Sequence, residues 1–363
     1  MRILIFQDIL RSGGTERQSV LLANELAEAG HTVTLLTIRP GGKLRDTVAR
    51  NVNLRTLQPF DTGLDWFAPG LAVSIEEEAP SVVLCMGRMA NCYAGRIQRR
   101  NPDAVVVSTM RTGKPLPLLF RQSLQVTRHV VANSLEAAQI LKDQYAAPPE
   151  KITVIHNALV FPPENFKRTA KRSDEALALR RKFGAGAATA VLLNVAMFRP
   201  EKNHRELVEI ATRLPRGADW QLWLAGDGPT HTACAHLIAE RNLEAKVKLT
   251  GFFPDPRLLY RAADIAVMAS SSESLSNFLI EAHAHGLPSV AYAVTGGAEC
   301  GAALVEPGDR HQFIDTLSPL LFNETRRAAA AAEAVEHVAR FFPKGGSTGI
   351  YLNLFKQLTE KNE

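Results

Sequence analysis

The first 160 residues alternate between short apolar runs, rich in β-branched residues, and longer segments whose apolar positions recur at helical spacing. Residues 16–30 form one such predicted helix, with Gly30 as its C-terminal cap. Buried apolar strands that alternate with helices are typical of a parallel sheet covered on both faces. We predict strands at residues 2–6, 31–38, 81–86, 104–109, 129–133 and 152–157.

The pattern changes between Pro162 and Gly184, where the chain is polar, charged and almost free of β-branched residues. We interpret this segment as a linker with a short helix. The alternation then resumes, which indicates a second doubly wound sheet. The second set of predicted strands lies at residues 190–196, 220–226, 246–251, 264–270 and 288–294.

We therefore predict an α/β protein with two doubly wound, Rossmann-like domains that face a central cleft. The expected parts are an N-terminal domain (1–165), a linker (166–186), a C-terminal domain (187–342) and a helix (343–363) that crosses back to the N-terminal domain. Ligands of such sheets bind at the carboxyl ends of the strands, so the cleft is the expected site.

The composition is that of an ordinary globular protein, since 46% of the 363 residues are hydrophobic and 22% are charged. The four cysteines match no zinc or disulfide spacing, which favours a reducing compartment. We recognise no secretory signal and no run of about 18 apolar residues, so we expect a cytoplasmic protein. Aromatic residues make up only 7%, which argues against nucleic acid as a partner.

The first candidate site is the loop RSGGTER (11–17), between the first predicted strand and the first helix. Gly13 and Gly14 would let backbone amides approach a phosphate or a sugar at the positive end of a helix. An ordinary Gly-Gly turn is the alternative interpretation. The loop is not G-x-G-x-x-G, and the chain has no P-loop motif, which counts against a nicotinamide dehydrogenase and a P-loop enzyme.

The second candidate site is FRPEKNH (198–204), directly after a predicted buried strand. Arg199 offers a planar fork of donors and Lys202 a compact charge, a combination that suits a diphosphate. The alternative is a solvated loop in which Glu201 neutralises both bases.

The third candidate site is the Ser-rich segment at 270–292, where a strand ends in a loop and a helix begins near Ser276 and Asn277. Free amides at a helix start can hold an anion. Glu273 and Glu281 flank that start, and their carboxylates can accept hydrogen bonds from sugar hydroxyls. A surface Glu and a helix-face Glu without a ligand are the alternative. Two other strand ends offer Gly226, which permits close backbone approach, and Phe252, which would border a nucleobase.

Three motifs together carry a family resemblance: R-x-x-K-N, then G-x-G-P, then E-S-x-x-N-x-x-x-E-A-x-x-x-G-x-P. The chain resembles the retaining glycosyltransferases of family four (glycosyl transferases group 1), which have the GT-B fold. The resemblance covers almost the whole chain and is strongest between residues 190 and 300. It implies that Arg199 and Lys202 bind the donor's diphosphate, that Glu273 contacts the donor sugar and that Glu281 contacts the ribose.

The same resemblance implies further contacts to the donor and the acceptor. It places the donor's phosphates at the backbone of the segment Leu275, Ser276, Asn277 and Phe278, and the base beside the residues after Gly251. Gly13 and Gly14 would lie across the cleft. Many family members carry a His after a strand of the first domain, and here Arg111 stands at the corresponding place. Arg111 is therefore our candidate on the acceptor side.

The resemblance implies transfer, with retention, of a hexose-type sugar from a nucleotide-diphosphate sugar. We expect a UDP-sugar as donor and a cell-envelope glycan or a lipid-linked molecule as acceptor. No D-x-D-type acidic pair stands at a strand end, so we expect neither metal nor another cofactor. The alternatives are a nucleotide-sugar epimerase of the same fold and a non-catalytic, two-lobed protein that binds sugars or nucleotides.

Residues 85–130 carry eight bases but only one acid, Asp103. If these bases share a face, they would attract a phosphate-bearing acceptor or attach the protein to the anionic inner face of the cell membrane. A solvated basic face without a partner is the alternative. The bases are Arg88, Arg96, Arg99, Arg100, Arg111, Lys114, Arg121 and Arg128.

Overall fold

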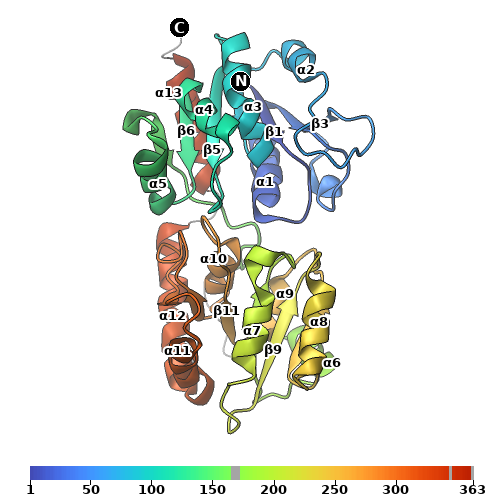
Figure 1. The fold of residues 1–363 in the computed structure, drawn as a ribbon, viewed down its shortest axis with the longest axis vertical. Helices are drawn as coiled ribbons and strands as arrows, with labels where there is room; N and C mark the ends of the chain where they lie inside the picture. The colour runs from blue at the N-terminus through green and yellow to red at the C-terminus, as the bar shows by residue number, and fades with distance from the viewer. Residues whose placement is uncertain (165–171, 343–345, 361–363) are drawn as a thin grey trace. The chain divides into compact units, whose positions relative to one another are not determined.

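The computed structural model describes residues 1–164, 172–342 and 346–360. The chain divides into two compact units, Met1–Val160 together with Gly345–Glu363, and Phe161–Lys344 (Figure 1). Residues 166–171 of the predicted linker and residues 343–345 and 361–363 of the predicted C-terminal segment lie outside the described residues.

The first unit is built on a seven-stranded parallel sheet with the order β3-β2-β1-β4-β5-β6-β7. Six of its strands coincide with the predicted apolar runs. The edge strand β3 is a four-residue polar segment, NLRT, without the apolar pattern from which the other strands were predicted. The strands are β1 (Arg2–Gln7), β2 (Thr32–Thr37), β3 (Asn53–Thr56), β4 (Val82–Cys85), β5 (Val105–Met110), β6 (His129–Ala132) and β7 (Ile152–Val154).

Alternation along the strands divides the core of the first unit between the two faces of the sheet. Ile3 and Ile5 of β1 pack with the helix that follows it and with the C-terminal helix, whereas Leu4 and Phe6 face the opposite side. Both faces are covered, so the central strands consist mainly of buried apolar residues. The helices are α1 (Gly14–Glu28), η1 (Arg45–Thr47), α2 (Leu71–Glu78), α3 (Arg88–Arg100), α4 (Leu118–Val126), α5 (Leu135–Tyr145) and η2 (Pro149–Lys151).

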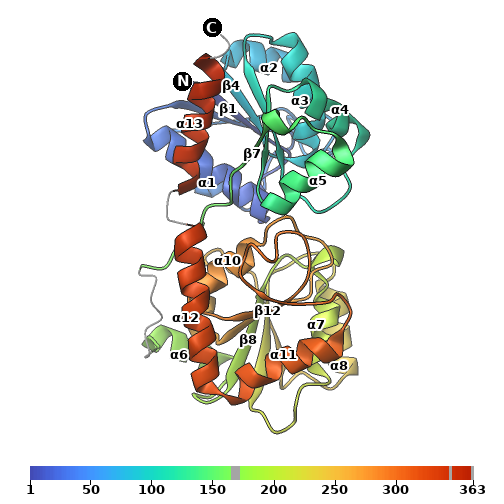
Figure 2. The same cartoon turned by 90° about the vertical axis from the view of Figure 1, so that its left-hand side faces the viewer.

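The second unit is built on a six-stranded parallel sheet with the order β10-β9-β8-β11-β12-β13. The short edge strand β13 was not predicted. One face packs on α7, α8 and α11, and the other carries α6, α9, α10 and α12 (Figure 2). The strands are β8 (Ala190–Val195), β9 (Trp220–Ala225), β10 (Val247–Gly251), β11 (Ile265–Met268), β12 (Ser289–Tyr292) and β13 (Ala303–Val305). The helices are α6 (Asp174–Lys182), η3 (Pro200–Lys202), α7 (His204–Ala211), α8 (His231–Glu240), α9 (Arg257–Ala262), α10 (Asn277–Ala284), α11 (Arg310–Phe322) and α12 (Glu324–Phe341).

The polar segment that we interpreted as linker contributes α6 to the second unit. Arg180 of this helix is only 1% exposed and donates to a carboxylate oxygen of Asp264 at 3.1 Å and to the carbonyl of Ala262 at 2.7 Å. It also donates to the carbonyl of Gly186 at 2.8 Å. A buried guanidinium with these partners fixes α6 against the amino ends of β8 and β11.

The C-terminal helix, α13 (Gly346–Glu360), belongs to the first unit, where it lies beside α1 (Figure 2). Tyr351 and Phe355 are buried in the core of that unit. Within the described ranges, no helix combines the length and the apolarity that crossing a bilayer requires.

Candidate active site

The loops that follow β8 and β11 meet at the carboxyl edge of the second sheet. These two strands are neighbours and parallel, so the segments that leave them adjoin. The backbone N–H of Ser271, after β11, donates to the carbonyl of Glu201 in η3 at 2.9 Å. The second and third candidate sites of the sequence therefore adjoin each other at this edge of the second unit.

Lys202 and Glu273 form an ion pair in this unit, with 2.6 Å between Nζ and Oε1. The Lys202 side chain is 27% exposed and the Glu273 side chain 10%, so water screens the pair only in part. Arg199 lies in the same turn, because the N–H of Lys202 donates to its carbonyl at 3.0 Å. The side chain of Arg199 is partly exposed and has no ion-pair partner in the described part of the chain.

The start of α10 follows directly on the Glu273 loop. Ser276 is the N-cap, and its hydroxyl accepts from the N–H of Leu279 at 3.4 Å. Leu275, Ser276 and Phe278 are buried, whereas Asn277 is partly exposed. The helix positions its first amides at the same edge as the Lys202–Glu273 pair, and a helix start favours anions.

Glu281 lies one helical turn further along α10 and is buried. Its Oε2 accepts a hydrogen bond from the hydroxyl of Tyr260, on α9, at 2.7 Å. The Tyr260 ring stacks on His285, with 5.1 Å between ring centroids. The carboxylate predicted to contact ribose is thus oriented by a buried tyrosine, which the sequence analysis did not identify.

The glycine-rich strand ends bring backbone close to backbone. Gly226 has φ +143°, and a Cβ there would lie 2.0 Å from the carbonyl oxygen of Ala196, after β8. Gly296 has φ +74°, and a Cβ there would lie 2.2 Å from the carbonyl oxygen of Ser274. Only glycine fits such positions without displacing the neighbouring loop. At Gly226 the backbone lies close to the loop after β8, and the close approach to a ligand that we expect there stays a prediction. Phe252, after β10, is partly buried.

Three predicted site residues belong to the first unit. Gly13 is the N-cap of α1 and Gly14 its first residue, so both lie at the carboxyl end of β1. Arg111 follows β5 and donates to Asn157 at 2.6 Å and to the hydroxyl of Tyr351 at 2.8 Å. In this structure its guanidinium anchors α13, a contact that the sequence analysis did not predict.

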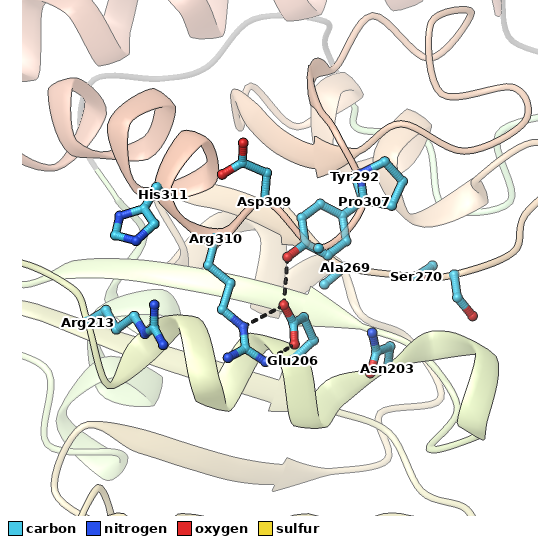
Figure 3. Close-up of a pocket in the computed structure, with 12 residues that line it drawn as sticks. Asn203, Glu206, Arg213, Ala269, Ser270, Tyr292, Pro307, Asp309, Arg310 and His311 are labelled. Atoms are coloured by element: carbon cyan, nitrogen blue, oxygen red, sulfur yellow. Dashed lines mark hydrogen bonds and ion pairs between the residues drawn. The ribbon is translucent and has the colours of Figure 1, made fainter.

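A cavity of about 590 Å³ lies beside this edge, between the starts of α7 and α11 (Figure 3). Glu206, on α7, receives two hydrogen bonds from Arg310 at 2.8 and 2.6 Å and one from the hydroxyl of Tyr292 at 2.7 Å. The bonds from Arg310 hold the pKa of Glu206 below its usual value. Burial and the Glu206 carboxylate raise the pKa of Tyr292.

The Glu206 cluster escaped the sequence analysis because its members come from three separate elements. Glu206 lies near the start of α7, Tyr292 at the end of β12 and Arg310 at the start of α11. Each follows or precedes a loop at the carboxyl edge, and that position was the only signal in the sequence. Among the described residues, no group of three or more His, Cys, Asp or Glu side chains is arranged to hold a metal ion.

Two Rossmann-like parallel sheets, with the candidate residues at the carboxyl edge of the second, define a protein of the GT-B type. Sequence models of two domain families match the chain, "Glycosyltransferase Family 4" over residues 12–159 and "Glycosyl transferases group 1" over residues 189–323. The chain belongs to this family of glycosyltransferases, as its motifs predicted.

Curated relatives carry different names. The chain is 32% identical over 238 residues to a D-inositol 3-phosphate glycosyltransferase of Thermobispora bispora. The matched region covers 61% of this chain and 54% of that protein. The chain thus spans about half the length of that relative. It is 26% identical over 353 residues to the lipopolysaccharide core biosynthesis glycosyltransferase LpsE of Rhizobium meliloti, covering 95% of this chain and 96% of the relative.

Solved structures resemble the chain over nearly its full length. HepE of Anabaena, in complex with UDP and glucose, matches with a TM-score of 0.82 at 19% identity, covering 98% of this chain and 99% of HepE. WaaG, a glycosyltransferase involved in lipopolysaccharide biosynthesis, matches with a TM-score of 0.75 at 17% identity, covering 97% and 99%. At these identities the likeness shows the fold alone, which is the predicted GT-B fold.

Proposed function

We propose that the chain is a retaining glycosyltransferase that moves a hexose-type sugar from a UDP-sugar to a cell-envelope glycan or a lipid-linked acceptor. The observation that carries the proposal is the Lys202–Glu273 ion pair at the start of α10. It places a cation for a diphosphate and a carboxylate for sugar hydroxyls within one small volume, at the edge where such sheets bind ligands.

The cationic side of the site stabilises the departing nucleoside diphosphate. Arg199 and Lys202 supply two positive charges, and the first amides of α10 supply aligned dipoles. Each charge-assisted hydrogen bond contributes roughly 1.5–3 kcal/mol. These charges come from the protein, so the reaction needs no metal ion in this proposal.

The acidic side of the site orients the donor. Glu273 would accept hydrogen bonds from the sugar hydroxyls, and Glu281, held by Tyr260, would accept them from the ribose. A carboxylate that is already buried and hydrogen-bonded loses little freedom when a ligand binds, which favours affinity. The bond between the anomeric carbon and the diphosphate breaks, and the acceptor oxygen bonds to the same face of that carbon. The leaving diphosphate takes the acceptor's proton.

The relatives support the choice of donor and acceptor. HepE was crystallised with UDP and glucose, and LpsE is named for lipopolysaccharide core biosynthesis. The T. bispora relative is named for D-inositol 3-phosphate, a molecule that carries a phosphate. The UDP of HepE supports a UDP-sugar as donor, and the name of LpsE supports a cell-envelope acceptor.

The proposal is tested with UDP-, GDP- and ADP-linked sugars, each offered with short glycans and with polyprenyl-phosphate-linked sugars. We expect release of UDP that depends on the acceptor, a product with the donor's anomeric configuration by NMR, and unchanged turnover with EDTA. Lys202→Ala should reduce turnover by about 10²-fold or more. The matched control is Lys246→Ala, which removes an exposed lysine paired with Asp219 at 3.7 Å.

Other results would assign another activity. Conversion of the donor sugar to its epimer would indicate the epimerase, and binding of the nucleotide sugar without turnover across the whole panel would indicate a binding protein. An inverted product would overturn the retaining mechanism. Loss of turnover with EDTA and its recovery with Mg²⁺ or Mn²⁺ would overturn metal independence.

A further inference from the structure

The cavity beside the carboxyl edge of the second sheet, which we call the α7–α11 cavity, extends along α7 (Figure 3). Asn203 lies at the start of this helix and Arg213 just beyond its end, and both residues line the cavity. At ~1.5 Å of rise per residue, the helix separates them by roughly 15 Å. The volume of about 590 Å³ lies within the roughly 300–1,000 Å³ of small-molecule sites, so the cavity can hold a ligand larger than a free anion.

One end of the α7–α11 cavity carries three side chains that can be positively charged, Arg213, Arg310 and His311 (Figure 3). Arg310 is paired with Glu206 at 2.6 Å. Arg213 is exposed, and its side chain has no ion-pair or hydrogen-bond partner in the described part of the chain. Together with the bonds from Arg310, the charge of Arg213 helps to lower the pKa of Glu206, so this guanidinium acts on the cavity wall.

The two acids that line the α7–α11 cavity already have partners. Glu206 is held by Arg310 and by the hydroxyl of Tyr292. Asp309 is the N-cap of α11, and its carboxylate accepts the N–H of Gln312 at 2.9 Å, so its charge lies against the positive end of a helix. A phosphate group would therefore find one free guanidinium at this end, and a guanidinium binds phosphate through paired hydrogen bonds.

The other end of the α7–α11 cavity is polar but uncharged. Ser270, after β11, is only 2% exposed, and its hydroxyl has no hydrogen-bond partner among the described residues. The side chain of Asn203 does not cap α7, so its amide is available to a ligand. A hydroxyl and an amide both donate and accept hydrogen bonds, as sugar hydroxyls do. A buried hydroxyl without a protein partner favours a polar ligand at this end.

We propose that the α7–α11 cavity binds a sugar phosphate, with its phosphate at Arg213 and its hydroxyls at Asn203 and Ser270. A ligand with hydroxyls at one end and an anion at the other matches the two ends of the cavity. A nucleobase fits less well, because the ring of Tyr292 is buried and packs edge-on against Phe313, so it offers no free face for stacking.

The α7–α11 cavity and the proposed donor site share two loops. Asn203 directly follows Lys202, and Ser270 lies three residues before Glu273. Lys202 and Glu273 themselves do not line the cavity, so the two ligands would contact different residues of the same loops. A sugar phosphate that fixes Asn203 and Ser270 would order both loops before the donor binds, so UDP should bind more tightly in its presence. This coupling rests on the proposed function, whereas binding to the cavity does not.

The experiment is isothermal titration calorimetry of the full chain with a hexose 6-phosphate, a hexose 1-phosphate, the free hexose and inorganic phosphate. We expect a hexose phosphate to bind at least about ten-fold more tightly than the hexose or phosphate alone, because both ends of the cavity then contribute. Saturating UDP should not displace it. Lys202→Ala should bind it as the unmodified protein does, since that lysine belongs to the donor site.

Two substitutions separate the ends of the cavity. Arg213→Ala should weaken binding of the hexose phosphate and of inorganic phosphate at least about ten-fold, because a charge-assisted contact is lost. Ser270→Ala should weaken binding of the hexose phosphate and leave that of inorganic phosphate unchanged. The matched control is Arg216→Ala, which removes an exposed arginine of the same loop outside the cavity lining and should change neither. Thermal unfolding checks that each variant is folded.

Four outcomes would overturn the proposal: no binding of either hexose phosphate, its displacement by UDP, equal loss in the Arg216 control, or unchanged binding by the folded Arg213 variant. Unchanged binding of the hexose phosphate by the Ser270 variant would contradict the assignment of the sugar end. These measurements need neither an acceptor nor turnover, so a failure of the proposed transfer would not alter them.

The coupling is measured by titrating UDP with and without the hexose phosphate. We expect UDP to bind about five-fold more tightly or better when the cavity is filled, and the hexose phosphate to gain the same factor from UDP, because binding free energies are reciprocal. Equal affinity for UDP under both conditions would show that the cavity does not act on the donor site.

Discussion

The ammonium group of Lys202 lies 2.6 Å from a carboxylate oxygen of Glu273, although 70 residues separate them in the chain. In the pair, the positive charge proposed to bind the diphosphate and the negative charge proposed to bind the sugar hydroxyls neutralise each other. A bound diphosphate would compete with Glu273 for the Lys202 ammonium, and sugar hydroxyls would then contact the released carboxylate. The ion pair thereby couples the two halves of the proposed donor site.

Glu273→Gln should separate nucleotide binding from transfer. The amide cannot hold Lys202 as strongly as the carboxylate does, so the ammonium becomes available and UDP should bind equally well or more tightly. Sugar contacts weaken, and transfer should fall by about 10²-fold. Calorimetry with UDP and steady-state turnover measure the two effects. A parallel loss of both would show that Glu273 does not divide the site in this way.

Glu206→Gln should impair the donor site without unfolding the protein. Its carboxylate joins the start of α7, directly after the Lys202 turn, to Tyr292 and Arg310 (Figure 3). The variant should raise KM for the donor more than it lowers kcat, with a roughly ten-fold loss in kcat/KM. Glu209→Gln is the control, because Glu209 pairs with Arg241 at 2.8 Å on the same helix, away from these loops. Equal effects of both substitutions would exclude a positioning role.

The free energy of unfolding should fall as the pH drops from 6.5 towards 4. Burial lowers the pKa values of His204, His283 and His285 from 6.5 to about 4. In this range the unfolded chain binds protons that the folded chain does not, so stability is present above pH 6.5 and is lost on acidification, by up to about 1.4 kcal/mol per pH unit for each histidine. Asp8 acts in the opposite direction, because burial raises its pKa to about 6.

Denaturant titrations across this pH range measure the slope. His204→Leu should make it shallower, since its ring packs face to face on Phe198 at 3.9 Å and neither ring nitrogen has a hydrogen-bond partner within the described ranges. An unchanged slope in this variant would mean that His204 titrates normally in the folded protein.

Arg180→Ala should strongly destabilise the second unit. The substitution leaves three buried carbonyl oxygens without their guanidinium donor, while Asp264 keeps its ion pair with Arg172. Each unsatisfied buried acceptor costs about 1–3 kcal/mol. The neighbouring Arg181 is exposed, so Arg181→Ala should change stability by less than about 0.5 kcal/mol. Thermal unfolding compares them, and similar midpoints would show that the Arg180 network contributes little.

The central strands were predictable because burial on both faces leaves a run of apolar residues, as in Val82–Cys85 and in the three valines that begin β5. The edge strand Asn53–Thr56 carries no such run, because its residues are only partly covered. The short helix predicted in the polar segment is present as α6. Its charged sequence did not indicate that Arg180 is buried, because Asp264 and carbonyls from other elements satisfy the guanidinium.

Local sequence determined which loops carry the candidate residues. A loop after a buried strand places its residues at the carboxyl edge of the sheet, and for this reason Arg199, Lys202 and Glu273 could be named as candidates, together with the start of α10. Tertiary structure alone decided which side chains meet. Asp8, after β1, accepts the N–H groups of Met89 and Ala90 and so caps α3, whose own N-cap is a glycine. Periodicity reports whether a residue is buried, but a hydrogen bond between distant elements depends on how the strands are ordered in the sheet, and no local pattern encodes that order.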